Sequence, residues 1–260
     1  MHPILFHIGH VTIYTYGLFV AAGFAVGITW TYFEGRREGI DPNKILDLAF
    51  YLVLSAILGS RLFYVLIEYH EYLKNPLRIF KIWEGGLVFY GGLILAGITG
   101  AWYILRHQLP HWKIMDIFAP GIALGHAIGR IGCFCAGCCY GKICHCSFGL
   151  VFTNPRSLAR LGVPLYPTQL ISAGMLGIIF LILIFIERHK KFDGQVFWSY
   201  VLIYATARFG IEFLRGDPRG FTIPGLISTS QGISLILIPL SIYFLIRLKR
   251  QQNRRKGVSS

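Results

Sequence analysis

Charged and sulfur-containing side chains are concentrated between Gly129 and Lys142, where the chain reads GRIGCFCAGCCYGK. Arg130 comes first, at the end of a long apolar run typical of a transmembrane segment. A guanidinium within a bilayer costs about 3 kcal/mol or more, so such residues usually face a polar cavity and mark function. The alternative is an arginine whose long side chain merely reaches the lipid headgroups. We favour a functional role for Arg130.

A second charged group follows the sixth apolar segment, in the sequence YATARFGIEFLRGDPRG. Arg208, Glu212 and Arg215 are spaced i, i+4, i+7, which predicts one helical face shared with Tyr204 and lets Glu212 pair with either arginine. Two cations around one carboxylate leave a positive charge for a phosphate group. The alternative is an ion-pair ladder that satisfies itself.

His126 lies one helical turn before Arg130, on the same predicted face. It is a candidate base, or else a buried and hydrogen-bonded histidine. Gly121, Gly125 and Gly129 repeat every fourth residue, a spacing that lets helix backbones approach closely in lipid.

All six cysteines fall within fourteen residues, at positions 133, 135, 138, 139, 144 and 146. Their spacing lacks the paired CxxC motifs of a zinc site, so we expect no metal. Cys144 and Cys146 can bridge to each other or to a neighbour in an oxidising compartment. No triad that would activate a cysteine nucleophile is visible.

The composition is that of an integral membrane protein. Of 260 residues, 54% are hydrophobic, and the mean hydropathy is +0.56. The net charge of +13 is explained by cytoplasmic loops and anionic lipids, and no basic face with interleaved aromatic residues indicates nucleic-acid binding. We expect one membrane domain over residues 1–260, a basic cytoplasmic tail over residues 248–260, and no cleavable signal peptide.

The apolar pattern predicts an all-α protein with seven transmembrane helices. Lys and Arg, above all those of the tail, favour an outside N-terminus and a cytoplasmic C-terminus. The predicted spans are Val11–Tyr32, Ile45–Glu68, Leu87–Leu105, Ile114–Phe134, Thr168–Ile186, Gln195–Leu214 and Gly225–Ile246.

Taken together, these motifs resemble the prolipoprotein diacylglyceryl transferase family. GRIGCFCAGCCYG is similar to the family signature GR-x-G-N-F-x-N-G-E-x-x-G. The resemblance extends in order over nearly the whole chain, through Tyr14-Thr15-Tyr16-Gly17, Gly59-Ser60-Arg61, Trp83-Glu84-Gly85-Gly86, Asp116 with Ala119-Pro120, Pro167-Thr168-Gln169-Leu170, and Arg208-Phe209 with Glu212 and Arg215.

The resemblance implies a seven-helix enzyme of the bacterial inner membrane that needs no metal or cofactor. It would transfer the diacylglyceryl group of phosphatidylglycerol to the lipobox cysteine in the signal peptide of a preprolipoprotein, releasing glycerol 1-phosphate. Its other surroundings would be membrane lipids.

The resemblance also implies roles for individual residues. Arg130 would bind the headgroup. The glycines that would shape the pocket are Gly129, Gly132 and Gly141. The polar residues near the reacting centre would be Arg208, Glu212 and Tyr16. The residues that would hold substrate or structure are Arg61, Asp116, Gln169 and Arg215.

Several positions depart from the family pattern. Cys133 and Cys138 replace an asparagine and a glutamate, and Tyr90 and Tyr166 stand where histidines are common. The base that deprotonates the thiol is therefore open among Tyr90, His126 and Glu212. We favour His126 slightly over Glu212, with Tyr90 as a hydrogen-bond partner.

Two further classes of function compete with the transferase. A catalytically silent relative that binds phospholipid would keep the arginines and lose the base. A transporter of anions would also use membrane arginines, but such folds often contain repeated halves, and this sequence has no internal repeat.

Overall fold

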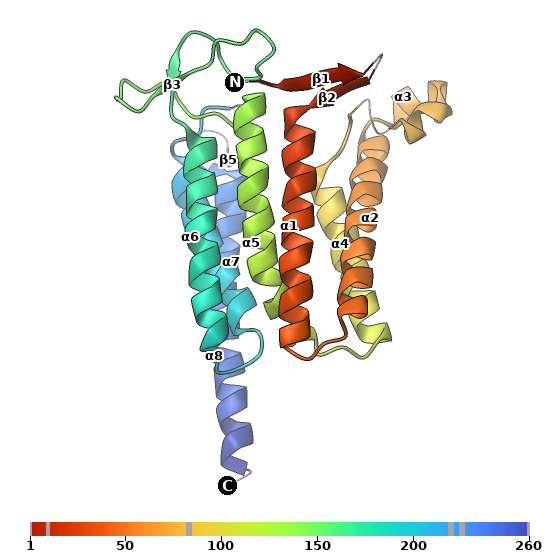
Figure 1. Cartoon of the computed structure of the whole chain (residues 1–260), viewed down its shortest axis with the longest axis vertical. Helices are drawn as coiled ribbons and strands as arrows, with labels where there is room; N and C mark the ends of the chain where they lie inside the picture. The colour runs from red at the N-terminus through yellow and green to blue at the C-terminus, as the bar shows by residue number, and fades with distance from the viewer. Residues whose placement is uncertain (1, 9–10, 82–84, 218–220, 224–226, 259–260) are drawn as a thin grey trace. The chain divides into compact units, whose positions relative to one another are not determined.

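The computed structural model describes residues 2–8, 11–81, 85–217, 221–223 and 227–258. Within these residues the chain is mostly helical, with three short two-stranded antiparallel sheets outside the helices (Figure 1). The prediction of an all-α protein therefore missed the sheets. The elements are β1 (Ile4–Ile8), β2 (Val11–Tyr14), α1 (Thr15–Arg37), α2 (Pro42–Ile67), α3 (Tyr69–Lys74), η1 (Pro76–Phe80), α4 (Phe89–Arg106), α5 (His111–Ala136), β3 (Leu150–Val151), β4 (Pro164–Leu165), α6 (Thr168–Arg188), α7 (Gln195–Glu212), β5 (Phe221–Ile223), β6 (Ile227–Ser228) and α8 (Thr229–Val258).

Five helices of the described chain are long and apolar enough to cross a membrane: α1, α2, α5, α6 and α8. A helix overlaps each predicted span, and most boundaries agree within a few residues, although α8 continues to Val258. The first span is wrong at its start, because Val11–Tyr14 is a strand paired with Ile4–Ile8. Three of the strand's four residues, Val11, Thr12 and Ile13, are β-branched, which suits a strand. The predicted start of the seventh span, Gly225, lies outside the described residues.

The chain forms two compact units, and the first comprises Met1–Thr31 with Met115–Ser260. In this unit α1 and α5 meet through glycines. A Cβ placed on Gly125 would lie 2.6 Å from the carbonyl oxygen of Gly23, and one on Gly27 would lie 2.8 Å from that of Gly121. Only glycine permits this approach, so the packing role predicted for Gly121 and Gly125 is confirmed.

A buried apolar cluster joins α5, α6 and α7 in the same unit. Its fully enclosed members are Ala119, Ala123, Ile179, Leu183 and Val196. Helix α8 packs on α7, where the rings of Trp198 and Phe244 stack with centroids 4.3 Å apart. These contacts set the positions of α5 and α7, which carry the arginines of the predicted site.

The connection between α5 and α6 has a small core of its own, made by Phe152, Ala159 and Leu165. Phe134, from the last turn of α5, packs against this core. The loop that begins at residue 137 is therefore anchored to the end of α5 by apolar contacts.

The second unit comprises Tyr32–Ile114 and is built on the packing of α2 against α4. A Cβ on Gly59 would lie 2.5 Å from the carbonyl oxygen of Gly91, so these two helices also meet backbone to backbone. Both helices lead to the segment containing α3 and η1, which Arg61 organises.

Candidate functional site

Arg130 and His126 form a contact one turn apart near the end of α5. Arg130 Nε donates a hydrogen bond to His126 Nε2 over 3.2 Å. A histidine nitrogen that accepts from a guanidinium carries no proton, so the imidazole is neutral in this arrangement. Tyr204 of α7 lies against the same histidine, with ring centroids 5.5 Å apart. The predicted face of α5 that carries Arg130 therefore adjoins the face of α7 that carries Tyr204.

Arg208 and Glu212 form an ion pair on α7, with Arg208 Nη2 2.5 Å from Glu212 Oε2. Both side chains are nearly buried, at 11% and 6% exposed. Ser230, in the first turn of α8, accepts a further hydrogen bond from Arg208 Nη2 over 2.9 Å. A buried pair of this kind depends on its hydrogen bonds to offset the loss of solvation, and the arrangement fixes the direction of the guanidinium.

Arg215 does not share that face, which corrects the sequence-based prediction. Helix α7 ends at Glu212, and Arg215 instead makes two hydrogen bonds to the carboxylate of Asp217, of 2.9 and 3.0 Å. Burial alone would lower the pKa of Arg215, but the bonds to Asp217 raise it above its ordinary value. Its guanidinium also hydrogen-bonds Cys139. The helix stops before the i+7 position because the following Gly-Asp-Pro is turn-forming.

The segment around Cys138 and Cys139 is held by the start of α6. Gln169 Nε2 donates to the carbonyl oxygen of Cys138 over 2.9 Å, and Thr168 Oγ1 donates to that of Cys139 over 2.8 Å. Both donors are fully buried. Gln169 therefore fixes the loop over residues 137–142, called the signature loop below.

Gly141 threads between two other segments of backbone. Its N–H donates to the carbonyl oxygen of Tyr166, and the next N–H, of Lys142, donates to that of Leu214. A Cβ at position 141 would lie 2.5 Å from the Cβ of Tyr166. Glycine is therefore required for the loop to pass, and this passage brings Cys139 beside Arg215.

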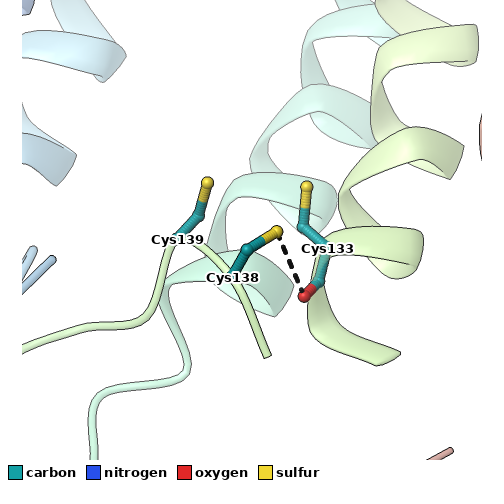
Figure 2. A group of neighbouring side chains, drawn as sticks. All are labelled: Cys133, Cys138 and Cys139. Carbon is teal, nitrogen blue, oxygen red and sulfur yellow. Dashed lines mark hydrogen bonds between the residues drawn. The ribbon is translucent and has the colours of Figure 1, made fainter. Parts of the chain in front are cut away.

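Three cysteine side chains converge at this point. The sulfur atoms of Cys133, Cys138 and Cys139 all lie within 4.8 Å of one another, and Cys138 also contacts the carbonyl oxygen of Cys133 (Figure 2). Hydrogen bonds from the other two thiols, together with Arg215, lower the pKa of Cys139, whereas those bonds and burial raise the pKa of Cys138. Cys144 and Cys146 form a disulfide with each other, the first of the two pairings considered from the sequence.

Gly132 and Gly129 face different surroundings on α5. A Cβ on Gly132 would lie 2.8 Å from the Cβ of Phe19 and 3.3 Å from the carbonyl oxygen of Tyr16. Tyr16, in the first turn of α1, therefore lies directly beside the signature. Outside the neighbouring residues of α5 itself, no described atom lies within 4 Å of the corresponding position on Gly129, so the surface of α5 is open there.

Asp116 does not join this group. Fourteen residues separate it from Arg130 along α5, a distance of about 21 Å. Its fully buried carboxylate accepts the backbone N–H groups of Gly194 and Phe197 over 2.7 and 2.9 Å. It therefore caps the start of α7.

Arg61 and Tyr90 belong to the second unit. Every N–H group of the Arg61 guanidinium is engaged by backbone carbonyl oxygens, those of Arg78, Ile79, Lys81, Gly85 and Gly86. Tyr90 lies in the first turn of α4 and is about half exposed. Trp83 and Glu84, quoted for the resemblance, lie outside the described residues.

The apolar helices and the paired arginines on α5 and α7 define a multi-pass membrane protein with a polar, cationic site. Residues 3–247 match the family model described as prolipoprotein diacylglyceryl transferase, and the chain belongs to this family.

Curated relatives support the same assignment. A phosphatidylglycerol–prolipoprotein diacylglyceryl transferase of Clostridium tetani is 34% identical, covering 96% of this chain and 100% of the relative. A protein named phosphatidylglycerol–prolipoprotein diacylglyceryl transferase 2, of Clostridium perfringens, is 35% identical, covering 96% of this chain and 97% of the relative. A relative from Geobacillus kaustophilus, with the same description, is 35% identical, covering 92% and 89%.

Proposed function

We propose that this chain transfers the diacylglyceryl group of phosphatidylglycerol to the lipobox cysteine of preprolipoproteins. The observation that carries the proposal is the adjoining of the Arg130–His126 and Arg208–Glu212 pairs on two helices of one unit. Membership in the prolipoprotein diacylglyceryl transferase family indicates which reaction this site would catalyse. The alternatives of a silent lipid-binding relative and an anion transporter have no observation of their own in their favour.

Arg130 binds the phosphodiester in this proposal. A planar guanidinium can make two parallel hydrogen bonds to phosphate, and the open surface of α5 beside Gly129 gives the headgroup access to it. Arg208 supplies a second fixed cation, held by Glu212 and Ser230. Cations fixed in a water-poor site stabilise the charge that develops on the departing glycerol phosphate.

The substrate thiol attacks the carbon of the diacylglyceryl group that is bonded to the phosphate ester oxygen. A carbon–sulfur bond forms, the carbon–oxygen bond breaks, and glycerol 1-phosphate leaves with the electron pair. The thiol must first lose its proton. When Arg130 turns to the phosphate, Nε2 of His126 is released from its hydrogen bond and becomes able to accept that proton. Glu212 is less suited, because its carboxylate is held by Arg208.

The remaining residues position this machinery. Gln169 and Gly141 fix the signature loop, and Gly132 allows Tyr16 to lie beside it. The family resemblance alone supports Tyr90 as a hydrogen-bond partner of lipid or thiol. Arg61 and Asp116 act on structure, through the loop before α4 and the start of α7. Arg215 acts through Asp217 and Cys139 rather than by binding phosphate directly.

We further propose seven spans in the bacterial inner membrane, with the N-terminus outside and the C-terminus in the cytoplasm. Helices α4 and α7 have 18 residues each and reach about 27 Å, close to the hydrocarbon thickness. The Cys144–Cys146 disulfide suits an oxidising compartment at the Arg130 end, and the basic end of α8 suits the cytoplasm.

Complementation tests the function. The chain is expressed in bacteria depleted of their own transferase, and the gel mobility of a reporter lipoprotein is followed. We expect the lipidated form to return with the wild-type chain and to be absent with Arg130→Ala at equal abundance. Failure of the wild-type chain to restore it while present in the membrane would contradict the proposal.

A further inference from the structure

The three cysteines that replace or follow family positions in the signature form a pre-shaped cluster. Cys133 stands on the last turn of α5, and Cys138 and Cys139 face it from the loop that follows (Figure 2). The loop cannot drift, because Thr168 and Gln169 hold the carbonyl oxygens of its two cysteines. Cys139 has a φ of +61°, a left-handed conformation that is unfavourable for a non-glycine residue. The loop maintains this strain, and the thiols remain together.

The spacing of the sulfur atoms fits a thiophilic metal ion. A tetrahedral site with Zn–S bonds of about 2.3 Å separates its sulfurs by ~3.8 Å. The three sulfur atoms now lie within 4.8 Å of one another, and small side-chain rotations would bring them to the separation that zinc requires. Three thiolates select zinc over harder ions such as magnesium or calcium.

Only three ligands gather at this point among the residues that the structure describes. Three protein ligands and an open fourth position are the pattern of catalytic zinc sites, whereas structural sites have four. Cys133 is also three residues from Arg130, so the two side chains are neighbours on one face of α5. The cluster therefore adjoins the proposed headgroup site.

We propose that Cys133, Cys138 and Cys139 bind one Zn²⁺, and that its open position takes the thiol of the lipobox cysteine. The inference rests on the proposed function. It departs from the sequence-based expectation of no metal, and it gives this chain a means of activating the thiol where Tyr90 and Tyr166 replace histidines.

The step balances without a further reactant. The lipobox thiol coordinates Zn²⁺ and gives up its proton to His126 or to water, because a coordinated thiol is readily deprotonated. The resulting thiolate attacks the glycerol carbon, forming the carbon–sulfur bond. The carbon–oxygen bond breaks, and glycerol 1-phosphate takes the electron pair. The thioether is a weak ligand and leaves the metal, which undergoes no change of oxidation state.

Charge and redox conditions suit the ion. Three thiolates and Zn²⁺ carry one net negative charge, and Arg215, hydrogen-bonded to Cys139, lies next to it. The Cys144–Cys146 disulfide belongs to the same loop, so this end of the chain suits oxidising conditions. Three adjacent thiols would form disulfides there unless a metal held them.

Metal analysis of the full chain tests the site. The wild type and single variants are purified in detergent from cells supplied with zinc, and bound metal is measured by mass spectrometry. We expect about one zinc per chain in the wild type and in Cys135→Ser, whose thiol is outside the cluster. Cys133→Ser and Cys138→Ser should lose at least about tenfold in affinity. Cys138→His, which restores a zinc ligand, should recover binding and separates ligation from misfolding.

Cobalt tests the fourth position. Co²⁺ replaces zinc in the wild-type chain, and its visible spectrum is recorded while a synthetic lipobox peptide is added. The cysteine peptide should shift the cobalt bands, and the same peptide with serine should leave them unchanged. Wild-type protein without zinc, equal zinc in the serine variants, or a spectrum indifferent to the cysteine peptide would overturn the inference.

The two proposals fail separately. A metal-free wild-type chain that still transfers the diacylglyceryl group would remove the zinc site and leave the function intact. A cobalt spectrum that responds to the peptide, with no transfer from phosphatidylglycerol under any metal loading, would remove the function and keep the site.

Discussion

Arg130 and His126 share one hydrogen bond, and in the proposed mechanism this bond couples lipid binding to proton transfer. While Arg130 Nε donates to His126 Nε2, the imidazole has no lone pair to offer at that nitrogen. A phosphate that draws the Arg130 guanidinium away would free His126 Nε2 to accept the proton of the substrate thiol. In the proposed mechanism, His126 can therefore accept a proton at Nε2 only after lipid has drawn Arg130 away.

Replacing Arg130 by lysine tests the planar grip on phosphate. Lysine keeps the positive charge and loses the two-pronged hydrogen bonding, so transfer should fall by at least about tenfold, or ~1.4 kcal/mol. Initial rates in membranes measure it. Arg156→Lys, an exposed change in the loop after α5, should leave the rate unaltered. A wild-type rate for Arg130→Lys would remove Arg130 from the headgroup site.

The pH dependence of the rate tests the proton acceptor. A base must be unprotonated to act, so the wild-type rate should rise with pH and then level off. In His126→Gln the rate should be at least about a hundredfold lower and the rising limb should vanish. His189→Gln, an exposed control at the end of α6, should keep the wild-type profile. An unchanged limb in His126→Gln would transfer the role to Glu212 or Tyr90.

Single residues differ in how far the sequence determines their contacts. Arg130 with His126 and Arg208 with Glu212 were predictable, because each pair is four residues apart on a regular helix. The partner of Arg215 was not, because the helix ends before it. The cysteine cluster was hidden by linear spacing, since a helix end followed by a reversing loop brings Cys133 to Cys139.

At the scale of elements, the glycines of α1 and α5 set the position of the site. Ala at position 125 would press its Cβ against the carbonyl oxygen of Gly23, and such overpacking costs about 1–3 kcal/mol. We expect Gly125→Ala to lower the thermal unfolding midpoint in detergent. Gly174→Ala, on α6 with open space around its Cβ, should be neutral or stabilising by up to ~1 kcal/mol. Equal midpoints for the two variants would contradict this packing.

The segment before α4 depends on Arg61. Lysine at this position has three donors in place of five and cannot reach the same carbonyl oxygens, so Arg61→Lys should destabilise the protein by about 2 kcal/mol or more. Thermal unfolding measures the loss, with exposed Arg36→Lys as the control. If Arg61→Lys unfolds like the wild type yet needs far more phosphatidylglycerol, Arg61 binds substrate directly.

Helices were predictable as elements because their apolar runs are long and bounded by turn-forming residues. The hairpin of β1 and β2 was not, because Val11–Tyr14 continues the apolar run of α1 and pairing with Ile4–Ile8 is non-local. The path of Gly141 between Tyr166 and Leu214 depends likewise on segments distant in sequence. The signature motif identified Gly141 as a functional position but did not reveal that it lies between Tyr166 and Leu214.

At the scale of the whole molecule, the helices bring a cationic site and a thiol cluster to the same end of α5. One substrate is a lipid and the other is an apolar signal peptide, so both can reach the site from within the membrane. In the proposed mechanism, residues at this end of α5 bind the headgroup, hold the thiol and receive its proton.

The most direct test of the central claim uses the purified full-length chain, phosphatidylglycerol labelled in its glycerol headgroup, and a synthetic lipobox peptide. Mass spectrometry follows the peptide, and the released headgroup is identified by chromatography. The account predicts a peptide that gains one diacylglyceryl group in thioether linkage, with labelled glycerol 1-phosphate released in equal amount. A serine-substituted peptide should remain unmodified. Release of free glycerol or phosphatidate in its place, or an unmodified cysteine peptide with a folded enzyme, would contradict it.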